Sequence, residues 1–247
     1  MTTAPVADQQ RLLEVQALDT RLAQLAHQRA NHPLRAQLAE LQTRLDDVET
    51  AHVTSRTALG DLRRELAKAE QDVEQVRTRA ARDQARMESG SASVKDVQAL
   101  SSELENLARR QEALEEVELE VMERLEAHET ALAGLTSARD ELLAQRDALA
   151  ADLEREVAAI EEQGRAVQAD RAGRVEGLDA GLVTLYDRLR GQLGGLAVAL
   201  LRGRTCEGCR LELNPSDVAR ITAAPPEQVA RCEECGRILV RQADTAR

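Results

Sequence analysis

Aromatic residues are almost missing from this sequence of 247 residues, which contains no Phe, no Trp and a single Tyr, Tyr186. Because aromatic side chains bury large apolar areas, a globular core of this length would normally use them. The apolar residues are instead mostly Leu, Ala and Val, and 31% of all residues are charged. Such a composition is typical of long helices and coiled coils.

Long apolar runs are missing as well. No stretch of about 18 uncharged apolar residues is present, so no segment is expected to span a membrane. The first residues, MTTAPVADQQRLLEVQ, lack the basic start and apolar centre of a secretory signal. We therefore expect a cytoplasmic protein with no membrane partner. In that reducing compartment, paired cysteines favour metal binding over disulfides.

Lysine is rare, and the net charge is strongly negative. Only Lys68 and Lys95 occur among the 33 basic residues, and the formal net charge is −11. The negative charge lies in the first 201 residues, because residues 202–247 contain 8 Arg and 7 acidic residues. This acidic part is not expected to bind DNA or anionic membranes broadly.

An apolar heptad pattern begins at Leu34 and continues to Met87. Of the 16 positions reached by alternating steps of four and three, 13 are apolar. The pattern exceeds the roughly three to four heptads that indicate a coiled coil, so it predicts one long helix. Pro33 precedes it and disfavours helical geometry in the residue before it. We predict a kink near residues 31–33.

A turn is predicted near residues 88–93, where the heptad pattern stops at small residues and a glycine. Ser93 and Asp96 have the spacing of a capping box at the start of a new helix. A second, weaker apolar pattern follows, and glycines from Gly164 onward are expected to end that helix. Two long helices joined by a short turn predict an antiparallel hairpin.

Two histidines fall in one layer of the predicted hairpin. If Met87 faces residue 94, His52 lies near His128, deep between the helices. Such a polar layer fixes the register of a coiled coil. The alternative is a pH switch or a metal pair. The register interpretation is favoured because no carboxylate or cysteine accompanies the two histidines.

All four cysteines lie in two C-x-x-C pairs, Cys206/Cys209 and Cys232/Cys235. Two thiolates on one tight loop can reach a single ion at about 2.3 Å, and the second loop completes a tetrahedron. Four protein ligands leave no position for water or substrate, which indicates one structural Zn²⁺. A dithiol redox pair and an iron–sulfur cluster are the alternatives.

The segments around the cysteines predict a zinc ribbon. Gly236 permits a left-handed turn after the last cysteine, whereas Arg210 stands at that place in the first loop, where the same turn is a weaker expectation. A short helix is expected over residues 214–221 and short strands on either side of the cysteine loops. So small a domain depends on its metal for folding.

The predicted fold is therefore mainly α, with a long antiparallel coiled-coil hairpin followed by a small C-terminal zinc ribbon of short β-strands. The hairpin is assigned to residues 1–175, a short helix and linker to 176–195, and the C4 zinc ribbon to 196–247.

Four segments resemble a bacterial family with a long coiled-coil hairpin and a C-terminal C4-type zinc ribbon. They are Ser93–Leu100, Tyr186–Arg190, Ala197–Cys209 and Cys232–Leu239. The family is described as nucleic-acid-binding or uncharacterised, so the resemblance implies the fold and one functional alternative. Val240 stands where the family usually has an aromatic residue, which removes a stacking surface for a base.

No catalytic constellation or phosphate-binding loop is recognisable, so we expect neither an enzyme nor a small-molecule substrate. The favoured hypothesis is an adaptor that binds a protein partner through the hairpin tip at Ser93, Lys95 and Asp96. Its layout is similar to that of regulators that enter the RNA polymerase secondary channel with a coiled coil and a zinc finger. This similarity suggests a partner in the transcription machinery.

Nucleic-acid binding by the ribbon is the alternative hypothesis. Six arginines of the ribbon can contact phosphates. The same segment contains nearly as many acidic residues and no Phe, Trp or Tyr on which a base could stack. These arginines are Arg202, Arg204, Arg210, Arg231, Arg237 and Arg241.

Overall fold

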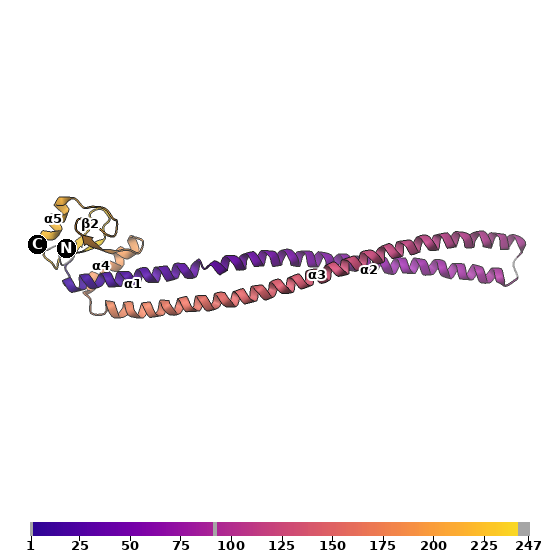
Figure 1. Cartoon of the computed structure of the whole chain (residues 1–247), viewed down its shortest axis with the longest axis horizontal. Helices are drawn as coiled ribbons and strands as arrows, with labels where there is room; N and C mark the ends of the chain where they lie inside the picture. Colours follow the sequence, from indigo (N-terminus) through magenta and orange to yellow (C-terminus); the bar gives the residue numbers. More distant parts are fainter. Residues whose placement is uncertain (1, 91–92, 242–247) are drawn as a thin grey trace. The chain divides into compact units, whose positions relative to one another are not determined.

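A computed structural model describes residues 2–90 and 93–241 of the chain (Figure 1). Residues 91 and 92 of the expected turn lie outside the described residues, as do Met1 and residues 242–247 at the two ends of the expected domains. The helices are α1 (Val6–Ala30), α2 (Pro33–Glu88), α3 (Val94–Val175), α4 (Ala180–Gln192) and α5 (Pro215–Ala223). The expected fold class, a long helical hairpin with small C-terminal strands, is confirmed.

Two compact units make up the chain. One combines residues 1–35 with 151–247, and the other consists of residues 36–150. Helices α2 and α3 each contribute to both units. Among the described helices, none combines the length and the apolar character that a membrane crossing requires.

The unit of residues 36–150 is an antiparallel pair formed by α2 and α3. Arg63 lies 2.8 Å from Glu129, and Arg79 lies 2.7 Å from Glu103, so the two helices run in opposite directions. The heptad positions meet between the helices, because apolar side chains at that spacing share one face. Buried members of this seam are Leu45, Leu59, Leu62, Val73, Val76, Leu107, Val121 and Leu142.

The expected layer of His52 and His128 is wrong. Glu49 pairs with Arg139 at 4.0 Å and Arg63 pairs with Glu129 at 2.8 Å. His52 therefore faces the segment between residues 129 and 139, and His128 lies beyond that segment toward the turn. Both histidines are half-buried rather than deeply buried.

The start of α3 carries the expected capping box. The backbone N–H of Asp96 donates to Ser93 Oγ at 3.2 Å, and Asp96 Oδ2 accepts from Ser93 Oγ at 2.7 Å and from its backbone N–H at 3.2 Å. These hydrogen bonds from Ser93 lower the pKa of the Asp96 carboxyl. Gly90 has a φ of 69° in the turn, a conformation that glycine adopts without strain.

The other unit contains the break between the first two helices. Pro33 begins α2, where its missing N–H and fixed φ are tolerated. His32 is buried just before it. Its Nδ1 accepts from the backbone N–H of Leu34 at 3.4 Å, so its Nε2 donates to Glu156 at 2.9 Å. The break is thus fixed to α3 by one side chain.

Helix α3 ends among the glycines that follow Gly164, as expected, although neither Gly164 nor Gly173 interrupts it. The helix continues to Val175, and Gly177, with a φ of 77°, provides the turn that follows it. A helical glycine costs only about 1 kcal/mol relative to alanine. This part of α3 also contacts α1, for example through the ion pair between Arg29 and Glu161 at 3.2 Å.

A four-stranded sheet has the order β2-β1-β4-β3. Strands β1 and β4 are parallel, and the outer pairs are antiparallel. One core joins the sheet to α1 and α4 through Leu12, Val15, Leu182, Tyr186, Val198 and Ile238. The strands are β1 (Val198–Arg202), β2 (Thr205–Cys206), β3 (Ala230–Arg231) and β4 (Ile238–Arg241).

Residues 2–4 pair in extended form with the segment that enters β3. The N–H of Val229 donates to the carbonyl of Thr2 at 3.0 Å, and the N–H of Ala4 donates to that of Glu227 at 2.8 Å. No local pattern in the sequence indicates this pairing.

Candidate metal centre

The two C-x-x-C segments form loops with the same backbone hydrogen bonds. In the first, the N–H of Cys206 donates to Leu211 at 3.1 Å, and the N–H of Arg210 donates to Cys206 at 2.7 Å. In the second, the N–H of Cys232 donates to Arg237 at 2.9 Å, and that of Gly236 donates to Cys232 at 2.8 Å. Each loop follows a short strand, so the sheet holds the two cysteine pairs against each other.

The residue after each second cysteine adopts a left-handed conformation. Gly236 has a φ of 73°, and Arg210 has a φ of 62°. In the described part of the chain, Arg210 is the one non-glycine residue with a positive φ. This conformation costs a non-glycine residue about 1 kcal/mol. The first loop therefore reaches the expected geometry despite its arginine.

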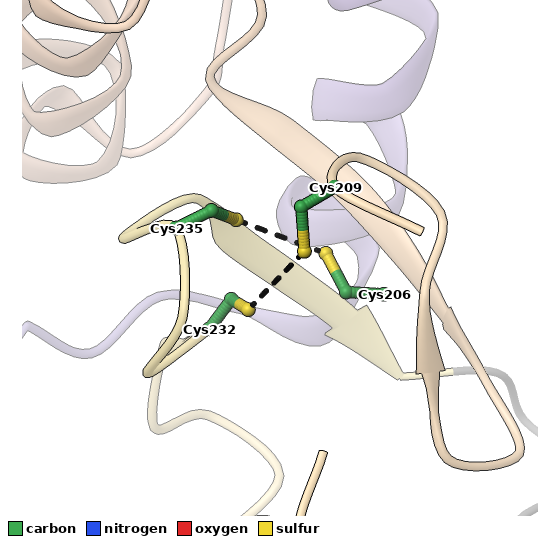
Figure 2. A group of neighbouring side chains, drawn as sticks. All are labelled: Cys206, Cys209, Cys232 and Cys235. Carbon is green, nitrogen blue, oxygen red and sulfur yellow. Dashed lines mark hydrogen bonds between the residues drawn. The ribbon is translucent and has the colours of Figure 1, made fainter. Parts of the chain in front are cut away.

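All four sulfur atoms converge (Figure 2), and they lie within 4.8 Å of one another. The Sγ atoms of Cys206 and Cys235 are 3.9 Å apart, as are those of Cys209 and Cys232. A tetrahedron with Zn–S bonds of about 2.3 Å has S–S edges of about 3.8 Å. A disulfide would require about 2.05 Å. The arrangement therefore fits one four-coordinate Zn²⁺ and not two disulfides.

The surroundings of the thiols shift their pKa values in different directions. Burial raises the pKa of Cys206, and it raises that of Cys232 to about 12. Burial alone would also raise the pKa of Cys235, but hydrogen bonds with Arg237, Cys232 and Cys209 together outweigh it and lower the pKa to about 7. Since zinc binds thiolates, metal binding must release protons from the buried thiols.

Close packing surrounds the first loop. A Cβ on Gly208 would lie 2.8 Å from Arg237 Cδ and 2.9 Å from Ala199 Cβ. A second apolar cluster covers the cysteines, and its buried members include Leu201, Leu213, Ile221 and Leu239. Because this cluster is small, the metal is expected to supply much of the free energy that folds it.

Most of the six ribbon arginines contact acceptors of the protein itself. Arg241 donates to five backbone carbonyls between Ile221 and Gln228, which ties β4 to the end of α5. Arg237 donates to the carbonyl of Leu196 at 2.8 Å. These two guanidinium groups serve the ribbon's own structure.

The other ribbon arginines lie at the surface. Arg202 pairs with Glu207 at 2.8 Å, and Arg204 lies 3.8 Å from Glu212. Arg231 donates from Nε to the carbonyl of Gly236 at 2.9 Å. Arg210 is exposed and forms no ion pair within residues 2–90 and 93–241.

At the hairpin tip, the three candidate residues have different surroundings. Ser93 and Asp96 are occupied by the capping box. Lys95 is exposed beside them, and the neighbouring Val94 is 80% exposed.

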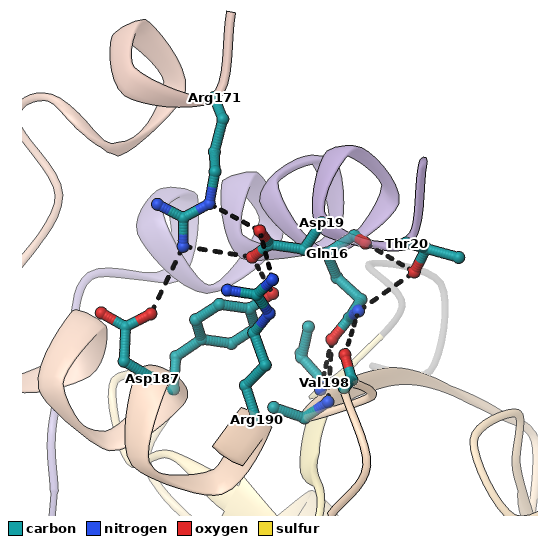
Figure 3. Close-up of polar contacts among 10 residues, drawn as sticks. Gln16, Asp19, Thr20, Arg171, Asp187, Arg190 and Val198 are labelled. Carbon is teal, nitrogen blue, oxygen red and sulfur yellow. Dashed lines mark hydrogen bonds and ion pairs between the residues drawn. The ribbon is translucent and has the colours of Figure 1, made fainter. Parts of the chain in front are cut away.

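Sequence reasoning missed a buried cluster around Asp19, at which α1, α3 and α4 meet (Figure 3). Asp19 is 2% exposed and accepts from Arg171 Nε at 2.7 Å and from Arg171 Nη2 at 3.1 Å. Arg190 lies 3.1 Å from the same carboxylate, and the hydroxyl of Tyr186 donates to it at 2.7 Å. The two cations neutralise this otherwise unfavourable buried charge.

Gln16 extends the contact to the sheet. Its Oε1 accepts from the backbone N–H of Ala197 at 2.8 Å, and its Nε2 donates to the carbonyl of Gly195 at 2.9 Å. Figure 3 shows this amide beside the start of β1. The zinc ribbon is therefore attached to α1 by polar contacts as well as by the apolar core.

Two family models match the chain. Residues 15–194 match a CT398-like coiled-coil hairpin domain, and residues 205–239 match a C4-type zinc ribbon domain. The resemblance to a family of hairpin and ribbon proteins is thereby confirmed. The four converging cysteines are the ligand set of that ribbon, consistent with one structural zinc.

The similarity to known proteins extends over nearly the whole length of this chain. An uncharacterised protein of Mycobacterium tuberculosis is 35% identical over 242 residues, which cover 96% of this chain and 97% of the relative. A solved structure from Mycobacterium smegmatis is 34% identical, has a TM-score of 0.86, and covers 97% of this chain and 100% of its own. CT398 from Chlamydia trachomatis shares the fold with a TM-score of 0.71 at 20% identity, covering 96% of this chain and 98% of its own.

Proposed function

This chain belongs to the CT398-like coiled-coil hairpin family and carries a C4-type zinc ribbon, and from that premise we propose that it binds a protein partner through the tip of its hairpin. The combination of hairpin and ribbon fits a non-enzymatic structural or adaptor role. Four cysteine ligands fill the coordination sphere of zinc, so the metal offers no position to a substrate.

One observation at the start of α3 carries the proposal. Val94 is 80% exposed and Val97 is 37% exposed. Residues three apart lie on the same face of a helix, so these two side chains form a small apolar surface. Lys95 is exposed beside them, and the Ser93–Asp96 capping box fixes the backbone beneath. A rigid apolar surface beside a cation suits a protein interface better than solvent.

The arrangement of the ribbon supports a protein partner over nucleic acid. Arg241 and Arg237 donate to the ribbon's own carbonyls, and Arg202 and Arg204 face carboxylates. Phosphate contacts would have to replace these interactions. Base stacking has no Phe, Trp or Tyr to use in the ribbon.

Affinity capture with the full, zinc-loaded chain tests the proposal. We expect Val94→Ser combined with Val97→Ser to lose the captured protein. Val53→Ser is the matched control, because Val53 is 55% exposed on α2. Purified RNA polymerase core is the first defined probe, since a partner in the transcription machinery was suggested by the sequence.

Capture that the tip variant leaves unchanged would overturn the proposal. An electrophoretic shift with mixed RNA and DNA at low and moderate salt serves as the second arm. A shift that persists at moderate salt would instead favour the nucleic-acid alternative.

A further inference from the structure

A pocket of about 370 Å³ lies among α4, α5 and the edge strand β3. Its apolar wall includes Leu185, Ile221 and Val229, and three arginines line it as well. We propose that this pocket binds one carboxylate side chain of an extended peptide from a partner protein, with an aliphatic neighbour against the apolar wall. No residue of the hairpin tip lines the pocket, so this proposal can be tested independently of the one for the tip.

One of the three arginine side chains that line the pocket has neither a hydrogen-bond partner nor an ion-pair partner in the described residues. Arg220 pairs with Asp217 at 2.9 Å and with Glu233 at 2.7 Å. Arg231 donates to the carbonyl of Gly236 at 2.9 Å. The side chain of Arg188 is exposed and has no hydrogen bond or ion pair within the described ranges. The chain has a net charge of −11, so an arginine without an acidic partner makes the local charge at this pocket positive.

A single carboxylate matches what the pocket offers. A guanidinium binds a carboxylate through two parallel hydrogen bonds, which gives geometric specificity. The volume is at the small end of the range of about 300–1,000 Å³ for ligand sites, which fits one or two side chains rather than a cofactor. The apolar wall provides a place for the adjacent aliphatic side chain.

A nucleic-acid strand is the less suitable occupant. It would bring repeated phosphate charges past Glu233, which already lines the pocket. None of the residues that line it is Phe, Tyr or Trp, so bases would find no stacking surface.

An extended segment of the chain itself already pairs along part of this sheet edge. Strand β3 is at the outside of the sheet, and residues 2–4 already pair beside the segment that enters it. Thr2 itself lines the pocket. Addition of an extended segment at a sheet edge is a common mode of peptide recognition.

The zinc site supports the charged side of this pocket. Glu233 lies between the two cysteines of the second loop, and Arg231 donates to Gly236 of that loop. A ligand that depends on these side chains should therefore bind the zinc-loaded chain more tightly than the chain treated with a chelator.

An NMR titration of the ¹⁵N-labelled, zinc-loaded full chain tests the proposal. The probes are two capped peptides that differ only in one central residue, Asp between two Leu in one and Asn in its place in the other. We expect the Asp peptide to shift the amides of Ala224 and Ala230 and to bind at least tenfold more tightly than the Asn peptide. Arg188→Gln should weaken binding of the Asp peptide at least tenfold.

Arg202→Gln is the matched control, because Arg202 is an exposed ribbon arginine that does not line the pocket. The affinity of this variant for the Asp peptide should stay within twofold of the affinity of the unmodified chain. Equal binding of the two peptides, no shifts at millimolar concentration, or an unaffected Arg188→Gln variant would each overturn the proposal. Tighter binding of a short single-stranded RNA to the same amides would do so in favour of a nucleic-acid site.

Discussion

The hydroxyl of Tyr186 donates a hydrogen bond of 2.7 Å to the buried carboxylate of Asp19. Tyr186 is the one tyrosine of a chain that has neither Phe nor Trp. Arg171 and Arg190 face the same carboxylate, so three helices meet at one side chain. This contact joins α4, and through it the ribbon's core, to α1 and α3.

Replacing Asp19 with Asn should destabilise the chain strongly. Arg171 and Arg190 would lose their shared anion while remaining largely covered, and breaking a buried ion pair costs about 3 kcal/mol. Urea unfolding followed by circular dichroism measures the change. Asp187→Asn is the control, since Asp187 also contacts Arg171 but its side chain is 52% exposed. That variant should change stability by less than about 1 kcal/mol, and equal effects of the two variants would contradict the assigned role of Asp19.

Alkaline pH should unfold this contact through Tyr186. Burial and the hydrogen bond to Asp19 raise the pKa of Tyr186 above its ordinary value of 10.0. A raised folded-state pKa means that the stabilisation is complete below about pH 10 and is lost as the pH rises further. Stability should therefore fall above pH 10, and less steeply in Tyr186→Phe.

Tyrosinate absorbance reports this group directly, because no other tyrosine and no tryptophan is present. We expect the absorbance of tyrosinate to rise together with the loss of helical signal. An ordinary titration near pH 10 in a chain that stays folded would show that Tyr186 is not buried beside Asp19.

Removal of one cysteine should abolish the metal site. Native mass spectrometry of the unmodified chain should give one zinc per chain, and Cys232→Ser should give well below one, because three thiolates complete no tetrahedral S₄ site. The ribbon should lose its structure, while residues 36–150 contain no zinc ligand and should stay helical. Ser216→Ala, outside the ligand set, should keep full metal content. A chain that binds no zinc when unmodified would contradict the assignment.

Local patterns explain why much of this fold could be predicted. The heptad seam of α2, the capping box at Ser93 and the cysteine spacing each depend on residues close together in sequence. The register between α2 and α3 depends on the turn and on contacts along the whole hairpin. The ion pairs of Glu49 with Arg139 and of Arg63 with Glu129 set a register in which His52 and His128 lie at different levels.

Long-range polar contacts had no local signal at all. Asp19 and Arg171 are separated by 152 residues, and Gln16 and Ala197 by 181. Neither Asp19 nor Gln16 differs in sequence from a residue on a solvated helix face. The arginines cannot be told apart by sequence either. Arg241 of the ribbon donates to five backbone carbonyls, whereas the side chain of Arg188 in α4 has no partner in the described residues.

Replacing Gly208 or Gly191 with alanine should change the stability of the chain in opposite directions. At Gly208 the new Cβ would lie 2.8 Å from Arg237 Cδ and 2.9 Å from Ala199 Cβ, so the first cysteine loop must shift. Overpacking of this kind costs about 1–3 kcal/mol. At Gly191, in α4, a Cβ meets no atom within 4 Å, and alanine should stabilise the helix by about 0.5–1 kcal/mol.

Chelator competition and thermal unfolding of the zinc-loaded chain distinguish the two variants. Gly208→Ala should unfold at a lower temperature and release zinc at a lower chelator concentration, because Gly208 lies between two of the zinc ligands, Cys206 and Cys209, in the loop that must shift. Gly191→Ala should unfold at a slightly higher temperature with unchanged zinc retention. If Gly208→Ala keeps both properties of the unmodified chain, the close approach of the first loop to Ala199 is not required for metal binding.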